Sequence, residues 1–202
     1  MYLSKVFISW RKARNPYDIH RELWKLFPNW PDSNRDFLFR VEKQQKGFGT
    51  EILMQSMQKP IRTDSACHIK AHREYNLSLA KGQRLRFRLR ANPTKKISDQ
   101  KGRINKKGEI KKCRVPLIRE EEQKDWLERK LANICSLDAL IIHSEVPMYF
   151  RIHKEQRSGK ILTVLFDGIL GVEFPSDFVD MIKMGIGPAK AFGCGLLSLA
   201  RI

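Results

Sequence analysis

The pattern of predicted secondary structure occurs twice along this 202-residue chain, and this repetition limits the folds that the chain can adopt. Hydrophobic periodicity predicts the order strand, helix, strand, strand, helix, strand before the pair Lys81 and Gly82, and the same order after it. The first half has predicted strands over 1–9, 36–44, 50–57 and 74–79, and helices over 16–27 and 65–73. The second half has a predicted strand over 84–90, strands across 140–152 and 160–172, a strand over 195–201, and helices over 120–133 and 175–184.

Two βαββαβ units in tandem indicate an α+β protein with two ferredoxin-like domains, each an antiparallel sheet that helices cover on one side. We expect these domains to span residues 1–81 and 82–202. The uncovered faces of the two sheets are expected to meet and form a cleft. Hydrophobic residues make up 42% of the chain, which suffices for packed cores and excludes global disorder.

The positive charge of the chain is concentrated in one segment. The whole chain has 39 Lys and Arg residues against 22 Asp and Glu residues, a formal net charge of +17. Fourteen basic and two acidic residues lie between Arg84 and Arg119, so this segment alone carries +12. Such clustering favours a polyanionic partner, and nucleic acid is the first candidate.

The basic segment has two parts with different predicted structures. In the first part, apolar residues alternate with Arg84, Arg86, Arg88 and Arg90. This period of two predicts a strand whose row of guanidinium groups can follow a phosphate backbone. The second part, residues 92–114, is nearly devoid of apolar residues and is predicted to be a mobile loop that a partner orders. Its candidate phosphate contacts are Lys95, Lys96, Lys111, Lys112 and Arg114. The alternative is a solvated sheet face followed by a solubilising loop.

The first predicted helix presents two groups that are suited to proton transfer. Asn15 is a favourable N-cap, and Pro16 suits the first helical position. Tyr17, His20 and Trp24 share one side of this helix, opposite its apolar residues. The helix N-terminus attracts phosphate, and a neutral imidazole can take a proton from a hydroxyl group. Spacing alone leaves ordinary surface residues as the alternative.

Other reactive residues form no convincing site. The predicted helix over 65–73 would place His68 and His72 one turn apart, as zinc ligands sometimes are, near Asp64 and Cys67. No second ligand pair accompanies them, so we favour surface histidines and expect no metal or other cofactor. All four cysteines, Cys67, Cys113, Cys135 and Cys194, are widely spaced and are expected to be reduced thiols.

The glycines of residues 185–195 surround Lys190 between the last predicted helix and strand. Their backbone amides and Lys190 can line a path for phosphate, or the glycines can serve only a tight turn.

The N-terminus lacks the apolar stretch of a secretory signal, and no apolar run has the length that a bilayer requires. We therefore expect a cytoplasmic protein without membrane contacts.

Several segments together resemble one known family. They are MYLSKV at 1–6, the Tyr17-x-x-His20 helix that ends in LWKLFP, RDFLFRVE at 35–42, FRLRANPTK at 87–95, CRVPL at 113–117, and GIGPAK-x-x-GCGLLSLA at 185–200. The chain resembles the CasE family, the repeat-processing endoribonuclease of the subtype I-E Cascade complex. The resemblance extends from the first residue almost to the last.

The resemblance implies tandem ferredoxin-like domains of the RAMP type and a metal-independent ribonuclease. Such an enzyme cuts CRISPR precursor RNA at the base of the repeat hairpin by attack of a 2′-hydroxyl, which leaves a cyclic phosphate and a 5′-hydroxyl. It then stays on the hairpin RNA and joins other Cascade subunits.

The resemblance also assigns roles to particular residues. It makes His20 the catalytic histidine and Tyr17 its partner, and we expect both in the basic cleft between the two sheets. A loop before the third strand of the second domain is implied near the cleavage site, here with Arg157, Ser158 and Lys160. The alternatives are a non-catalytic RNA-binding subunit and a general RNA chaperone, because fold alone does not determine activity.

Overall fold

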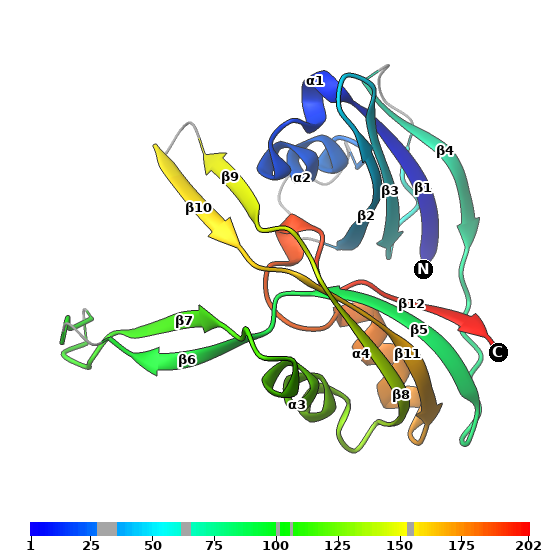
Figure 1. Cartoon of the computed structure of the whole chain (residues 1–202). Coiled ribbons are helices and arrows are strands. Elements are labelled where there is room, and N and C mark those ends of the chain that lie inside the picture. The colour runs from blue at the N-terminus through cyan, green and yellow to red at the C-terminus, as the bar shows by residue number, and fades with distance from the viewer. Residues whose placement is uncertain (28–35, 62–65, 100–101, 106, 153–155) are drawn as a thin grey trace.

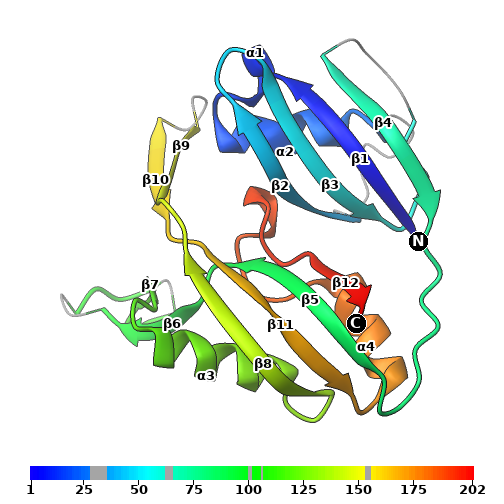
Figure 2. The same cartoon turned by 45° about the vertical axis from the view of Figure 1, so that its right-hand side comes forward.

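The computed structural model of the chain describes residues 1–27, 36–61, 66–99, 102–105, 107–152 and 156–202. These residues form two four-stranded antiparallel sheets, one above the other (Figures 1 and 2). Helices cover one face of each sheet. The architecture confirms the predicted tandem ferredoxin-like fold.

The N-terminal sheet has the strand order β2-β3-β1-β4. Its strands are β1 (Tyr2–Ser9), β2 (Phe37–Gln45), β3 (Gly49–Ser56) and β4 (Cys67–Glu74). The helices α1 (Trp10–Ala13) and α2 (Pro16–Trp24) follow β1. Ile19 and Leu23 of α2 are buried with Phe39 and Met54 of the sheet in one apolar core, so α2 covers this face.

The start of α2 follows from its sequence. Asn15 is the N-cap, with an extended backbone and a side chain that accepts a hydrogen bond from the Tyr17 amide at 3.4 Å. Pro16 occupies the first helical turn, as predicted. The helix ends at Trp24, before the predicted end, and the amides of Leu26 and Phe27 bond to carbonyl groups three residues earlier. A tighter turn therefore replaces the last predicted turn of α-helix.

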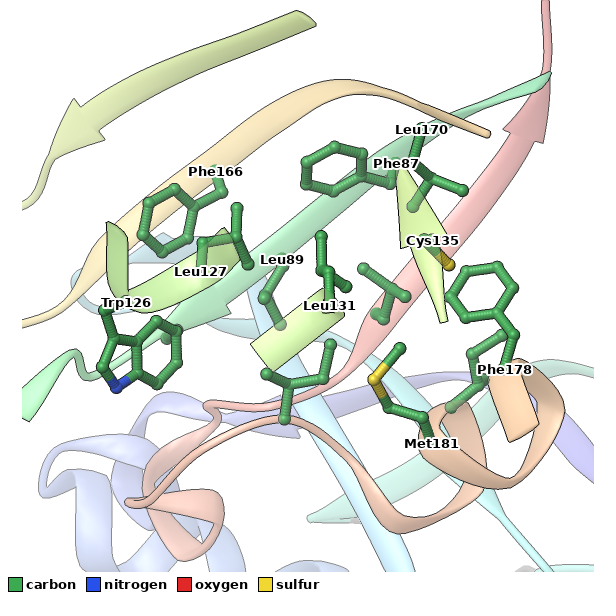
Figure 3. Close-up of a cluster of buried hydrophobic side chains, with 14 of the residues drawn as sticks. Phe87, Leu89, Trp126, Leu127, Leu131, Cys135, Phe166, Leu170, Phe178 and Met181 are labelled. Atoms are coloured by element: carbon green, nitrogen blue, oxygen red, sulfur yellow. The ribbon is translucent and has the colours of Figure 1, made fainter. Parts of the chain in front are cut away.

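The C-terminal sheet has the order β12-β5-β11-β8. Its strands are β5 (Arg84–Ala91), β8 (Cys135–Ser144), β11 (Val164–Val172) and β12 (Leu197–Arg201), and its helices are α3 (Glu120–Leu131) and α4 (Pro175–Met184). Figure 3 shows the core between this sheet and its helices. Phe87 and Leu89 of β5 lie there with Trp126 of α3 and Phe178 of α4.

Two hairpins are inserted in the C-terminal unit. The first consists of β6 (Thr94–Ser98) and β7 (Lys112–Pro116), and the second of β9 (Met148–Ile152) and β10 (Arg157–Ile161). The prediction of a structureless loop over 92–114 is therefore wrong. Ile97, Cys113 and Val115 are half-buried and lie next to the exposed Lys96, Lys112 and Arg114. This alternation is typical of strands, but the many basic residues of segment 92–114 obscure it when only the amino-acid composition is considered. The predicted loop at 157–160 is also wrong, because these residues lie in β10.

The prediction for residues 65–79 is wrong as well. Cys67–Glu74 form an edge strand that pairs antiparallel with β1, and residues 75–80 form neither a helix nor a strand. Pairing with β1 outweighs the weak local helical signal. His68 and His72 are therefore four residues apart along a strand, about 13 Å, rather than one helical turn. Asp64 lies outside the described residues.

Polar contacts connect the two units in addition to the extended segment 75–80 between β4 and β5 (Figure 2). Arg40 of β2 is only 4% exposed, and its Nη1 donates to the carbonyl of Arg88 at 3.0 Å and to Ser198 Oγ at 2.9 Å. Its Nε binds Glu42 at 2.7 Å. The Gln55 amide donates to the Ile182 carbonyl at 3.0 Å. Both side chains come from the face of the N-terminal sheet that α2 does not cover.

Candidate active site and nucleic-acid interface

The N-terminal half of α2 meets two elements of the C-terminal unit. These are the short 3-10 helix η2 (Lys190–Phe192) and the hairpin β9–β10. The ring of Phe192 lies 4.5 Å from that of Phe150 in β9 and 6.4 Å from that of Tyr17. We call this junction of α2, η2 and β9 the helix edge. It joins Tyr17 to parts of the chain more than a hundred residues away.

His20 lies close to the helix edge, one turn after Tyr17, and is half-buried. Its ring centroid is 5.4 Å from that of Phe37 and 6.4 Å from that of Phe39, with Trp24 edge-on at 6.1 Å. Less than 1 Å² of its Nε2 atom is accessible to solvent. The imidazole therefore packs against aromatic rings beneath α2 in the free protein.

The expected position of His20 in a basic cleft between the two sheets is wrong. Phe37 and Phe39 point to the face of β2 that α2 covers, whereas Arg40 points to the opposite face and contacts β5. Side chains alternate along a strand, so the sheet itself separates His20 from the arginine row of β5. The helix edge, rather than the space between the uncovered faces, is the candidate active site.

The arginine row of β5 exists as predicted, since Leu85, Phe87 and Leu89 are buried between the arginines. Three of the guanidinium groups have carboxylate partners, in the pairs Arg84–Asp138 at 2.7 Å, Arg88–Asp167 at 2.7 Å and Arg90–Glu145 at 2.6 Å. The hydrogen bonds that the Arg88 guanidinium donates to the Asp167 carboxylate raise the pKa of Arg88. Arg86 forms no ion pair with any residue that the structure describes. Most of the positive charge in this row is therefore neutralised within the protein.

The hairpin β6–β7 carries basic groups that stay accessible. Lys96, Lys112 and Arg114 share its exposed face, as the cross-strand pairs Lys96–Arg114 and Ser98–Lys112 indicate. Within the described residues, neither these three side chains nor the exposed Lys111 forms an ion pair. Lys95 lies on the other face and binds Glu122 of α3 at 2.8 Å. In Figure 1, β6–β7 and β9–β10 project from the same side of the molecule.

The glycine-rich segment 185–195 makes a compact turn. Gly185 has a φ of +75°, and a Cβ atom there would lie 2.6 Å from Leu38. Gly187 has a φ of +81°, and its Cβ would lie 2.8 Å from Trp126. The tight-turn interpretation is thus sufficient to explain both glycines. Lys190 Nζ donates to the carbonyl of Met184 at the end of α4.

The hairpin β9–β10 places the residues expected near the cleavage site on one of its strands. Arg157 is the first residue of β10, and Ser158 and Lys160 are exposed. Lys160 lies opposite Tyr149, with its Nζ 5.8 Å from the centre of that ring. Phe150 and Gly159 form the neighbouring cross-strand pair, so Lys160 lies on the face away from Phe192.

Within the part of the chain that the structure describes, no group of three or more His, Cys, Asp and Glu side chains could hold a metal ion. All four cysteines are free thiols, and burial raises the pKa of Cys135 and that of Cys194 to about 12. None of the described helices has the length and apolar character needed to cross a membrane.

The residues that assemble the helix edge were not predicted from the sequence. The sequence predicts Asn15 only as a helix cap, whereas its side chain also bonds to the backbone of Arg151. Phe150 and Phe192 received no role. The alternation of residues 148–152 was a usable signal for a separate strand with one packed face, but only the fold shows what packs on it.

Comparisons with known proteins agree with this fold. A family described as CRISPR associated protein matches residues 1–201. The Cascade subunit CasE of Escherichia coli K12 is 49% identical over 200 residues, which cover 99% of both chains. The crystal structure of Cas6e from E. coli K-12 superposes with a TM-score of 0.86 at 45% identity, over 100% of both chains. The CRISPR endoribonuclease Cse3 bound to a 19-nucleotide RNA gives a TM-score of 0.80 at 30% identity, over 99% of this chain and 100% of that one.

Proposed function

The chain belongs to the CRISPR-associated CasE family, and from this premise we propose that it cleaves CRISPR precursor RNA at the base of the repeat hairpin. After cleavage it remains on the hairpin as a subunit of a Cascade complex. The observation that carries this proposal is the 49% identity to a Cascade subunit across almost the whole chain. The similarity to an endoribonuclease that binds RNA supports the enzymatic part.

The proposed reaction is attack of a ribose 2′-hydroxyl on the adjacent phosphorus. The O2′–P bond forms, the P–O5′ bond breaks, and the products are a cyclic phosphate and a 5′-hydroxyl. His20 takes the proton from the attacking hydroxyl or gives a proton to the leaving 5′-oxygen. Tyr17, in the first turn of α2, orients the scissile phosphate near the positive end of the helix. The nucleophile is the 2′-hydroxyl, which DNA lacks, so the reaction selects RNA. Because this nucleophile is part of the substrate and a side chain transfers the proton, the proposed reaction requires no metal.

The packing of His20 adds a condition to this mechanism. A side chain that exchanges a proton with RNA must come within hydrogen-bond distance of the reacting oxygen. The ring therefore turns away from Phe37 and Phe39 when substrate binds at the helix edge.

We also propose how the RNA is held. The exposed face of β6–β7, with Lys96, Lys112 and Arg114, contacts phosphates of the stem together with Lys111. Arg86 is the best placed of the β5 arginines for a phosphate, because the structure gives carboxylate partners to Arg84, Arg88 and Arg90. Lys95, Arg157, Ser158, Lys160 and Lys190 are further proposed RNA contacts.

We place the boundary between the two domains at residues 81 and 82, and the protein in the cytoplasm, where precursor transcripts are made.

The decisive experiment measures cleavage of a cognate repeat RNA in EDTA by wild type and by His20→Ala. We expect the substitution to lower the cleavage rate about 10²–10⁴-fold and to leave RNA affinity nearly unchanged. His143→Ala, at an exposed position on β8, is the matched control and should cleave normally.

A second substrate carries a deoxyribose at the nucleotide before the cut and should stay intact. Intact RNA in every reaction would instead support a non-catalytic RNA-binding subunit. Undiminished cleavage by His20→Ala would disprove the assigned role of His20.

A further inference from the structure

The two faces of the hairpin β9–β10 differ in chemistry. Along β9 the side chains alternate strictly, with Met148, Phe150 and Ile152 half-buried and Tyr149 and Arg151 exposed. The cross-strand partners of the exposed pair are Lys160 and Ser158, which are also exposed. Among the residues that the structure describes, the outer face of the hairpin therefore presents the Tyr149 phenol ring, the Arg151 and Lys160 cations and the Ser158 hydroxyl group.

Tyr149 is unusually accessible for an aromatic side chain. It is 67% exposed, and the contact that the structure gives its ring is the Lys160 ammonium 5.8 Å from its centre. Such an arrangement of an exposed π face beside a cation does not stabilise a core. It does match the chemistry of a nucleotide, which offers a flat base and a negative phosphate.

The packing of the inner face fixes the position of the outer face. Phe150 packs against Phe192 at 4.5 Å, and a Cβ atom at Gly159 would lie 2.4 Å from the Phe150 ring. The Asn15 side chain also bonds to the Arg151 backbone. Tyr149 is thus held at a defined position beside the helix edge. The hairpin β9–β10 that carries it projects from the same side of the molecule as β6–β7 (Figure 1).

We propose that Tyr149 is a stacking platform for an unpaired base of the RNA that flanks the repeat stem, with Lys160 and Arg151 on the adjoining phosphates. The inference rests on the proposed function and adds a site for single-stranded RNA to it. On binding, the base takes the place of the Lys160 ammonium on the ring, and the ammonium moves to a phosphate. Stacking tolerates any base, so this site contributes affinity and register rather than sequence choice.

The test compares two RNAs, the repeat stem alone and the stem with its single-stranded flank, both with a deoxyribose that blocks cleavage. Tyr149→Leu removes the aromatic face and keeps an apolar side chain, and it should weaken binding of the flanked RNA about 5- to 150-fold. Binding of the stem alone should not change. Tyr149→Phe keeps the ring and should restore the affinity of wild type.

Two controls make the outcome specific. Phe174→Leu removes an exposed aromatic ring at the start of α4 and should bind both RNAs like wild type. A flank that carries 2-aminopurine should lose fluorescence on binding to wild type and to Tyr149→Phe, but not to Tyr149→Leu. Since Tyr149 is mostly exposed, all three variants should unfold at the temperature of wild type.

An equal loss of affinity for both RNAs, or none in Tyr149→Leu, would overturn the inference. Either result leaves the proposed function intact if wild type cleaves a normal repeat and His20→Ala does not. Failure of the proposed function would instead appear as the absence of cleavage by wild type.

Discussion

The side-chain amide of Asn15 pairs with the backbone of Arg151 in both directions. Its Nδ2 donates to the Arg151 carbonyl at 2.6 Å, and the Arg151 amide donates to its Oδ1 at 3.3 Å. Asn15 therefore acts like a short strand added to the free edge of β9 while it also caps α2. One residue connects the helix that carries His20 to the hairpin that carries Tyr149 and Lys160.

Asn15→Ser separates these two tasks. Serine caps a helix about as well as asparagine, but its hydroxyl is too short to reach Arg151. We expect the Arg151 amide to exchange its hydrogen faster in Asn15→Ser than in wild type, while amides of α2 keep their protection. Asn15→Ala loses the cap too and should be about 1 kcal/mol less stable than Asn15→Ser. Unchanged exchange at Arg151 would show that the amide pair does not hold the hairpin.

Arg40 provides a test of the contact between the two sheets. Arg40→Met keeps an unbranched apolar stem but removes the hydrogen bonds to Arg88 and Ser198 and the ion pair with Glu42. Hydrogen bonds of charged groups contribute the most, so the free energy of unfolding in urea should fall by about 2–3 kcal/mol. Lys43→Met, an exposed position on the same strand, is the control. A loss below about 0.5 kcal/mol in Arg40→Met would refute this role.

Local sequence patterns correctly predicted those elements whose structure depends on their own residues. The start of α2 follows from Asn15 and Pro16, and the alternation of arginine with Leu85 and Phe87 shows a strand with one buried face. Both patterns act over a few residues, so they persist whatever packs against them. The repeated order of elements predicted the tandem fold correctly, although β4 stands where the second helix of the first unit was expected.

Contacts between distant segments account for the errors. β4 is a strand because β1 lies beside it, and the arginines of β5 are neutralised because Asp138 and Asp167 come from strands that neighbour each other only in the folded chain. The surroundings of His20 depend on which face of β2 carries Phe37. A single sequence contains the residues of these contacts but not their pairing.

The dependence of RNA binding on salt should distinguish the two basic surfaces. Each phosphate contact contributes about 0.7–0.9 to the slope of log affinity against log salt concentration. The double variant Lys96→Gln with Lys112→Gln removes two accessible charges from β6–β7, so the slope should decrease by about 1.4–1.8. Arg84→Gln with Arg88→Gln removes two charges that already have carboxylate partners and should change the slope less. A larger decrease of the slope in the β5 variant than in the β6–β7 variant would indicate that the main phosphate contacts lie between the two sheets.

The packing of His20 predicts its chemical reactivity in the free protein. Diethyl pyrocarbonate modifies accessible imidazoles, so His20 should react more slowly than the exposed His72 and His143, as mass spectrometry of peptides can measure. Trp24→Ala removes the ring that lies edge-on to His20 and should increase its rate of modification. His143 in the same sample is the internal control, because its surroundings do not include α2. Equal rates for His20 and His143 in wild type would mean that the imidazole is already turned outward before RNA binds, and no ring rotation would then be needed for cleavage.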